Sequence, residues 1–169
     1  PMAPDASPVT TFYLEMRAST ELRPAPRQDA LEVRECEVPQ FEVNRFLYRF
    51  VGHGWEWTEK LGWSDAAWRA WAEDPMLRTW IAYHRGSPAG YFELQKQPRE
   101  EVEIAYFGLA RAFIGRGFGG ELLTRCIECA WAWGAARVWV HTCSLDHPAA
   151  LANYEARGMR LYRQETHPR

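Results

Sequence analysis

Three glycines near the middle of the chain form a pattern that could bind a phosphate. Gly115, Gly117 and Gly120 belong to the run FIGRGFGG at 113–120, which follows a strand-like segment and precedes a helical one. Glycines leave room for a phosphate to approach backbone N–H groups at the positive end of the helix. Arg116 could add a charge-assisted contact. The run therefore predicts an anion-binding loop, with a ligand-free helix entrance as the alternative.

The same letters satisfy GxGxxG, the loop pattern of dinucleotide-binding folds. In those folds the loop opens the first strand-helix unit, and several further units follow it. Here about fifty residues remain after the loop, and five residues separate Leu109 from Gly115, which is too long for the tight turn of that fold. We therefore favour a different kind of nucleotide-binding fold.

The cysteines do not form a recognisable metal site or disulfide framework. Cys126 and Cys129 make a CxxC, but both lie in a segment with helical periodicity, without a second CxxC or a histidine pair at zinc spacing. We expect these two, together with Cys36 and Cys143, to be reduced thiols with packing roles, and we expect no metal.

The composition is that of one globular domain. The chain has 169 residues, of which 47% are hydrophobic and 25% charged, and its net charge of −2 argues against a nucleic-acid partner. It shows no apolar run of membrane-spanning length and no secretory leader pattern. These features favour a cytoplasmic protein with no membrane partner.

Hydrophobic periodicity and turn residues divide the chain into alternating elements. Residues 1–10 lack periodicity and are expected to form a flexible tail, so that 11–169 make the single domain. Strand character is found at 11–17, 31–38, 78–85, 91–95, 102–109, 137–143 and 159–165. Helices are expected from Phe41 to Gly52, from Asp65 behind an N-cap at Ser64, over 121–133, and from an N-cap at Asp146 to Gly158. This order predicts an α/β or α+β domain around one mixed sheet.

The strand at 102–109 has alternating positions that predict which side chains share a face. Strict alternation would put Glu103, Ala105 and Phe107 on one face of the sheet. Val102, Ile104 and Tyr106 would then lie on the opposite face.

Two motifs in this frame resemble the GNAT superfamily of acyl-CoA-dependent N-acetyltransferases. The run IGRGFG at 114–119 fits the family pattern Q/R-x-x-G-x-G/A, with Ile114 at the Gln/Arg position. The second motif, N-x-x-A-x-x-x-Y-x-x-x-G-F, is matched by HPAALANYEARGM at 147–159, with Tyr154 in place and His147 at the asparagine position. The resemblance covers roughly 76–163.

The resemblance implies a mostly antiparallel central sheet flanked by helices, in which the strands at 102–109 and 137–143 part to hold acetyl-CoA. Residues 11–75 would then form the acceptor side, and 76–163 the acetyl-CoA-binding core. Exposed backbone on the first of these strands would pair with pantetheine like an added strand. The residues expected to bind the cofactor are Phe107, Gly108, Leu109, Ile114, Gly115, Arg116, Gly117, Phe118, Gly119, Gly120, His147 and Asn153.

Acetyl transfer to an amine needs a neutral amine, a polarised carbonyl and a proton for the departing thiolate. Tyr154 stands at the position of the family's tyrosine, and we expect it to be the acid. Glu103, on the strand that leads into the gap, is the expected base, directly or through water. Glu93 and His141 are reserve candidates for the base. Backbone N–H at the end of the 102–109 strand is expected to polarise the carbonyl.

Acceptor pockets in this superfamily usually come from the N-terminal helices, which points to the aromatic-rich stretch at 45–63. Tyr48, Trp55 and Trp57 are the expected acceptor-binding residues, either as an apolar slot or as faces for a cation. Glu56 and Glu59 are the only acids of this stretch, so a small amine with apolar or aromatic bulk is favoured over a polycationic aminoglycoside.

The first hypothesis is an acetyl-CoA-dependent N-acetyltransferase that acts by direct attack in a ternary complex. One alternative is a noncatalytic acyl-CoA sensor, and another is a protein N-terminal or lysine acetyltransferase with an open peptide groove. The resemblance also allows a homodimer, which the sequence does not show.

Overall fold

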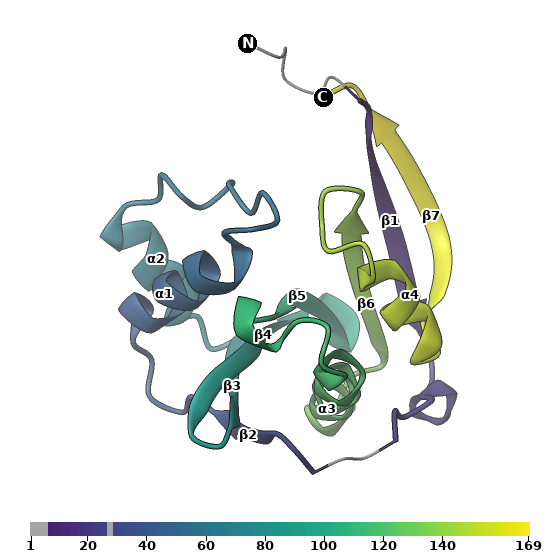
Figure 1. The fold of residues 1–169 in the computed structure, drawn as a ribbon, viewed down its shortest axis with the longest axis horizontal. Coiled ribbons are helices and arrows are strands. Elements are labelled where there is room, and N and C mark those ends of the chain that lie inside the picture. Colours follow the sequence, from purple (N-terminus) through teal and green to yellow (C-terminus); the bar gives the residue numbers. More distant parts are fainter. Residues whose placement is uncertain (1–6, 27–28) are drawn as a thin grey trace.

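The computed structural model describes residues 7–26 and 29–169. Within them seven strands form one sheet in the order β2-β3-β4-β5-β6-β1-β7, antiparallel except for the pair β5–β6 (Figure 1). The strands are β1 Val9–Met16, β2 Glu32–Glu35, β3 Leu77–His84, β4 Ser87–Gln97, β5 Glu101–Leu109, β6 Arg137–Cys143 and β7 Arg160–His167. The α-helices are α1 Phe41–Gly52, α2 Asp65–Ala72, α3 Phe118–Ala132 and α4 Ala150–Ala156. The predicted fold class, a mostly antiparallel mixed sheet flanked by helices, is confirmed.

The helices cover opposite faces of the sheet, as two neighbouring residues of β4 show. Tyr91 packs with Leu47 and Val51 of α1. Phe92 points the other way, into the large core that contains Leu122 of α3. Because successive side chains of a strand alternate between faces, α1 and α3 lie on opposite sides of β4.

Helix α1 spans Phe41–Gly52 as predicted, and α2 begins directly after Ser64 as predicted. The Ser64 hydroxyl accepts a hydrogen bond from the Ala67 N–H at 3.2 Å, so it caps α2. Trp68 of α2 and Tyr48 of α1 are buried against one another in an edge-to-face contact with ring centroids 5.6 Å apart. None of the described helices is long and apolar enough to span a membrane.

The core beneath α3 follows the helical periodicity of the sequence. Leu122, Leu123, Cys126 and Ile127 are completely buried. The four cysteines are free thiols, and burial raises the pKa of Cys126 well above its usual range. Among the residues that the structure describes, no group of three or more histidine, cysteine or acidic side chains is placed to hold a metal ion.

The first strand is inserted between two strands from the end of the chain. β1 pairs antiparallel with both β6 and β7, so that Leu14 lies between Val140 and Leu161 (Figure 1). The expected tail is therefore too long, because Val9 and Thr10 already pair in β1. Residues 1–6 of that tail lie outside the described residues.

A bulge in β5 overturns the expected alternation of its side chains. Glu93 of β4 lies opposite Tyr106, but the next residue, Leu94, lies opposite Ile104, so Ala105 is the extra residue. Beyond the bulge the faces are exchanged. Tyr106 joins the aromatic cluster on the α1–α2 side, and Phe107 packs against the core on the α3 side.

Candidate active site

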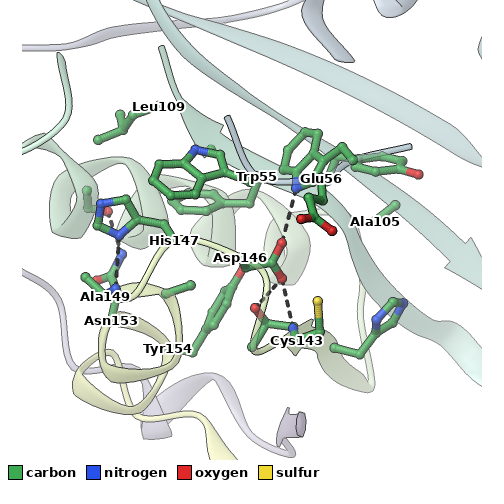
Figure 2. A pocket seen from close by; sticks show the side chains of 18 of the residues that line it. Trp55, Glu56, Ala105, Leu109, Cys143, Asp146, His147, Ala149, Asn153 and Tyr154 are labelled. Carbon is green, nitrogen blue, oxygen red and sulfur yellow. Dashed lines mark hydrogen bonds between the residues drawn. The ribbon is translucent and has the colours of Figure 1, made fainter. Parts of the chain in front are cut away.

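The pocket lies where β5 and β6 separate. Parallel pairing joins Glu101–Glu103 to Arg137–Trp139, and no further pair links the two strands in the described part of the chain. β5 then continues past the bulge to Leu109, and β6 continues to Cys143. A pocket of ≈ 800 Å³ opens in this gap, lined by both strands, by the segment between α1 and α2, and by the start of α4 (Figure 2).

One wall of the pocket is the glycine loop and the first turn of α3. Gly117 is the N-cap of α3 with φ of +86°, and no side chain in the described part of the chain caps this helix end. The first N–H groups of a helix have no partner within the helix, so they are open to an anion. The lining here consists of Ile114, Gly115, Gly119 and Gly120. Asn153 of α4 also lines the pocket, and its amide donates to the Gly119 carbonyl at 3.0 Å.

Three loop residues expected to bind the cofactor do not line the pocket: Arg116, Gly117 and Phe118. The Arg116 guanidinium lies 5.4 Å from the ring centres of both Phe113 and Phe118. Phe118 is buried in the core. Arg116 is therefore held by its own loop, and Gly117 acts through its backbone conformation. The expected strand residues Phe107, Gly108 and Leu109 do line the pocket.

Tyr154 of α4 faces the gap between β5 and β6. It is buried, lines the pocket, and packs on Phe107 with ring centroids 6.1 Å apart. Burial, with smaller contributions from Cys126 and Asp146, raises the pKa of the phenol well above its usual range. The phenol is therefore protonated throughout the neutral range and is available as a proton donor.

Glu103 lies at the vertex of the gap, on the last parallel pair of β5 and β6. Its Oε1 accepts a hydrogen bond from the Gln97 amide at 2.9 Å, and its Oε2 lies 3.5 Å from Nε2 of His141. Burial raises the pKa of Glu103, while His141, Gln97 and Lys60 oppose that rise. The carboxylate lines the pocket together with His141, as a base would have to do.

The two expected acceptor-binding tryptophans bridge the gap. The indole N–H of Trp57 donates a hydrogen bond to Asp146 Oδ1 at 3.2 Å. The Trp55 and His147 rings make an edge-to-face contact with their centroids 4.8 Å apart (Figure 2). Both lie in the segment between α1 and α2, and both line the pocket. This segment therefore contacts the opposite wall directly.

Asp146 is a pocket residue that the sequence did not identify. It was expected to be the N-cap of the last helix, but α4 begins at Ala150, and none of the described side chains caps it. Asp146 Oδ2 instead accepts from the Thr142 hydroxyl at 2.6 Å and the Cys143 N–H at 2.9 Å. The N-cap pattern is local, whereas the Trp57 contact comes from 89 residues away.

Tyr48 does not line the pocket, which corrects its assignment as an acceptor-binding residue. It is 1% exposed, and its hydroxyl accepts from the Lys60 backbone N–H at 3.1 Å. Its ring lies behind Tyr106 in an edge-to-face contact at 5.4 Å. The reason is helical phase, because position 48 lies on the buried face of α1, against Trp68 of α2 and Tyr106 of β5.

Lys60 is a second pocket residue that the sequence did not identify. Its ammonium lies 4.5–4.8 Å from the ring centres of Trp63, Trp71 and Tyr106, and it donates to the Tyr106 hydroxyl at 2.6 Å. Burial lowers the pKa of this amine. The sequence offered one signal for this residue, the rarity of lysine, because Lys96 is the only other lysine in the chain.

Glu93, a reserve candidate for the base, is buried behind this wall. Its carboxylate accepts hydrogen bonds from the Trp71 indole and the Thr79 hydroxyl, each at 3.0 Å, and from the Asn44 amide. Burial raises the pKa of Glu93 despite these donors. Glu93 is not among the residues that line the pocket, so its role is to hold α1, α2 and the sheet together.

Comparison with known proteins identifies the fold. The sequence profile of the Acetyltransferase (GNAT) family matches residues 32–159, which include the glycine loop and both walls of the gap. The chain belongs to the GNAT family. An uncharacterised N-acetyltransferase of Mycobacterium tuberculosis is 27% identical over 108 residues, which are 62% of this chain and 69% of that protein.

Solved GNAT structures share the fold. A GCN5-related N-acetyltransferase from Kribbella flavida superposes with a TM-score of 0.67 at 14% identity, covering 94% of this chain and 56% of that one. An aminoglycoside acetyltransferase from an uncultured soil metagenomic sample gives a TM-score of 0.60 at 23% identity, covering 79% of this chain and 93% of that one. This chain thus spans little more than half of the Kribbella protein.

The pocket fits the co-substrate that GNAT proteins generally use, acetyl-CoA. The β5 edge beyond Glu103 is not paired with β6, so its backbone groups are free to bind the amides of a pantetheine arm. The uncapped N-terminus of α3 suits a pyrophosphate. These two features lie on the same pocket, which also contains Tyr154 and Glu103.

Proposed function

We propose that this protein is an N-acetyltransferase that transfers the acetyl group of acetyl-CoA to a primary amine of a small acceptor. The observation that carries the proposal is the joint lining of one pocket by the open β5 edge, the α3 N-terminus, Tyr154 and Glu103. Membership of the GNAT family and relatives named as N-acetyltransferases support an acyltransferase.

In the proposed reaction the amine attacks the thioester directly within a ternary complex. Glu103 takes the amine proton, itself or through water, and Tyr154 protonates the departing thiolate. Backbone N–H groups at the end of β5 polarise the acetyl carbonyl. A phenol is protonated at neutral pH even at its ordinary pKa near 10, so Tyr154 holds a proton that it can give to the thiolate.

The acceptor is proposed to be an amine with apolar or aromatic bulk. Trp55, Trp57 and Trp71 line the pocket beside Tyr106, which supplies flat apolar surface. These faces also attract a cation. Lys60 is held among such faces in this structure.

A polycationic acceptor is the second candidate, because the fold gathers more acids than the stretch 45–63 contains. Glu103 and Asp146 come from other parts of the chain and line the same pocket as Glu56 and Glu59. The aminoglycoside acetyltransferase among the structural neighbours is 23% identical, so it supports the fold and leaves the acceptor open.

The test is a thiol-release assay with acetyl-CoA and a panel of acceptors. The panel contains arylalkyl amines, an aminoglycoside, and peptides with a free N-terminus or lysine. We expect thiol release with the arylalkyl amines in preference to the other acceptors. Mass spectrometry should then show that the nitrogen of these amines is acetylated. Release with the aminoglycoside alone would favour the second candidate. Binding of acetyl-CoA without release by any amine would favour a sensor, and release with peptides alone a protein acetyltransferase.

A further inference from the structure

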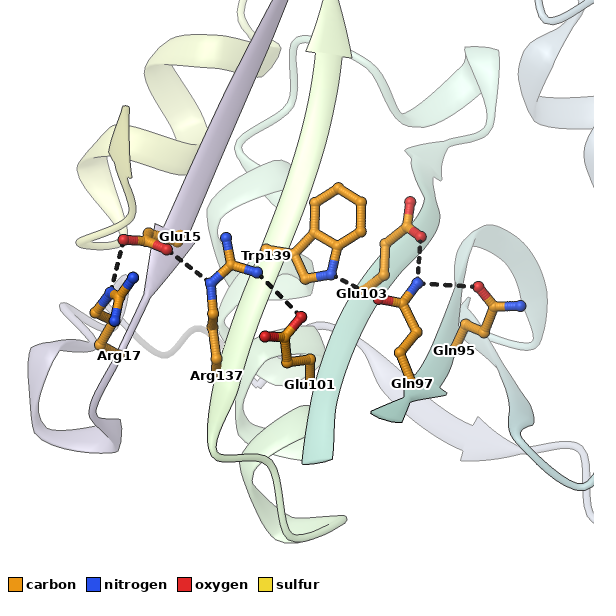
Figure 3. A network of polar contacts seen from close by, with 8 residues as sticks. All are labelled: Glu15, Arg17, Gln95, Gln97, Glu101, Glu103, Arg137 and Trp139. Atoms are coloured by element: carbon orange, nitrogen blue, oxygen red, sulfur yellow. Dashed lines mark hydrogen bonds and ion pairs between the residues drawn. The ribbon is translucent and has the colours of Figure 1, made fainter. Parts of the chain in front are cut away.

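A chain of hydrogen bonds crosses three strands at the vertex of the gap (Figure 3). The indole N–H of Trp139 on β6 donates to Gln97 Oε1 of β4 at 3.0 Å. The Gln97 amide nitrogen donates to Glu103 Oε1 at 2.9 Å and to Gln95 Oε1 at 3.2 Å. Glu103 and Trp139 are also the last residues paired between β5 and β6.

The chemistry of these groups fixes the direction of each bond. An indole N–H can only donate, so the side of Gln97 that faces Trp139 must be its carbonyl oxygen. The amide NH₂ must then point to Glu103. Trp139 therefore determines that Glu103 receives a donor at Oε1, and Oε2 is left on the side of His141.

We propose that Gln97, oriented by Trp139, is a positioning residue for Glu103, holding one carboxylate oxygen so that the other serves as the base in the pocket. The inference rests on the proposed function, because it assumes that Glu103 takes the proton of the acceptor amine. Gln97 itself is not among the residues that line the pocket, and it acts through Glu103.

The hydrogen bond has a second consequence, which concerns ionisation. A donor to a carboxylate stabilises the charged form, and the Gln97 amide opposes the rise in the pKa of Glu103 that burial causes. The titratable groups that face Glu103 from other elements are His141 of β6 and Lys60 and Glu59 of the α1–α2 segment. These groups remain in place when Gln97 is replaced. A change in the pKa of Glu103 therefore reports the loss of the Gln97 amide.

Gln97→Met tests the inference, because methionine keeps the length of the side chain and loses both donors. With the donor gone the pKa of Glu103 rises further, so the base form is lost at a higher pH. We expect the acidic limb of the kcat/KM profile to move up by about one pH unit. Trp139→Phe leaves the Gln97 amide free to flip. This variant should move the acidic limb in the same direction by a smaller amount.

The matched control is Gln164→Met, which makes the same chemical change at an exposed position of β7. It should leave the acidic limb where it is in the unchanged protein. Melting temperatures of all variants show whether each is folded. If Gln97→Met does not fold, Trp139→Phe carries the test, because it retains an aromatic ring at the partly buried position 139.

A readout that does not need turnover separates this inference from the proposed function. The Glu103 side-chain carboxyl is titrated by ¹³C NMR in the ligand-free protein, assigned by comparison with Glu103→Gln. The inference predicts a higher midpoint in Gln97→Met, and equal midpoints would overturn it. If Glu103→Gln keeps full turnover, the proposed base is wrong, whatever the NMR midpoint shows.

Discussion

Tyr154 and Tyr91 are both buried tyrosines, and their surroundings give their hydroxyls different roles. Tyr154 lines the pocket between β5 and α4. Tyr91 is completely buried against α1, and its hydroxyl has no hydrogen-bond partner among the described residues. Burial raises the pKa of both phenols well above the usual range. Only the Tyr154 hydroxyl is therefore placed to give a proton to a group in the gap.

We predict that Tyr154→Phe lowers kcat roughly 10- to 1000-fold, the range of effects expected for a general acid. The dissociation constant of acetyl-CoA should stay within about twofold, because the ring remains against Phe107. Steady-state kinetics and calorimetric titration measure the two quantities. Tyr91→Phe removes the same atom outside the pocket and should leave kcat unchanged. Equal kcat in Tyr154→Phe and the unchanged protein would remove Tyr154 from the mechanism.

At the level of elements, the α3 N-terminus is the part of the pocket that we propose to bind the pyrophosphate. Its cap, Gly117, has φ of +86°, and Gly134 just beyond the other end of the helix has φ of +90°. A β-branched residue in this left-handed region strains the backbone by about 1–2 kcal/mol. The two glycines have the same local requirement, but only the Gly117 end borders the pocket.

We predict that Gly117→Val weakens acetyl-CoA binding at least about tenfold, because the strained loop can no longer present its N–H groups to the pyrophosphate. Gly134→Val should lower the free energy of unfolding by about 1–2 kcal/mol and leave the affinity for acetyl-CoA unchanged. Calorimetric titration with acetyl-CoA and chemical denaturation provide the measurements. A folded Gly117→Val variant with normal affinity would show that the loop does not hold the phosphates.

At the scale of the whole molecule, a ligand in the gap would connect the two parts of the sheet. On one side lie β2 to β5 with α1 and α2, and on the other lie β6, β1 and β7 with α4 (Figure 1). They are joined by the short β5–β6 pairing, by the hydrogen bond from Trp139 to Gln97, by the core that both parts share with α3, and by the tryptophan contacts with Asp146 and His147. A ligand that contacts both sides binds the folded state alone, so it must stabilise that state.

We predict that acetyl-CoA and CoA raise the melting temperature and that NADH does not. At 100 times its dissociation constant a ligand stabilises the native state by about 2.7 kcal/mol. For a domain of this size, in which 1 kcal/mol moves the melting temperature by about 2–4 °C, that corresponds to a shift of roughly 5–11 °C. Differential scanning fluorimetry over a ligand series measures the shift. Stabilisation by NADH instead would return the glycine loop to the dinucleotide interpretation.

Much of the fold and one wall of the site could be predicted from the sequence, because the signals are local. The periodicity of Leu122, Leu123, Cys126 and Ile127 specifies the buried face of α3 without knowledge of its partner. The glycine loop is a contiguous run, and its position between strand and helix is also a local property. Ser64 caps α2 through an N–H three residues away.

The tertiary structure alone decided the remaining features, because each depends on residues that are distant in sequence. The bulge at Ala105, which exchanges the faces of Tyr106 and Phe107, exists only in the register of β5 against β4. Asp146 receives its tryptophan from 89 positions away. Strand alternation and helix caps are rules of nearest neighbours, whereas a pocket is made where separate elements meet. The sequence by itself thus determined the elements and the glycine loop, and the packing of those elements decided which side chains share the pocket.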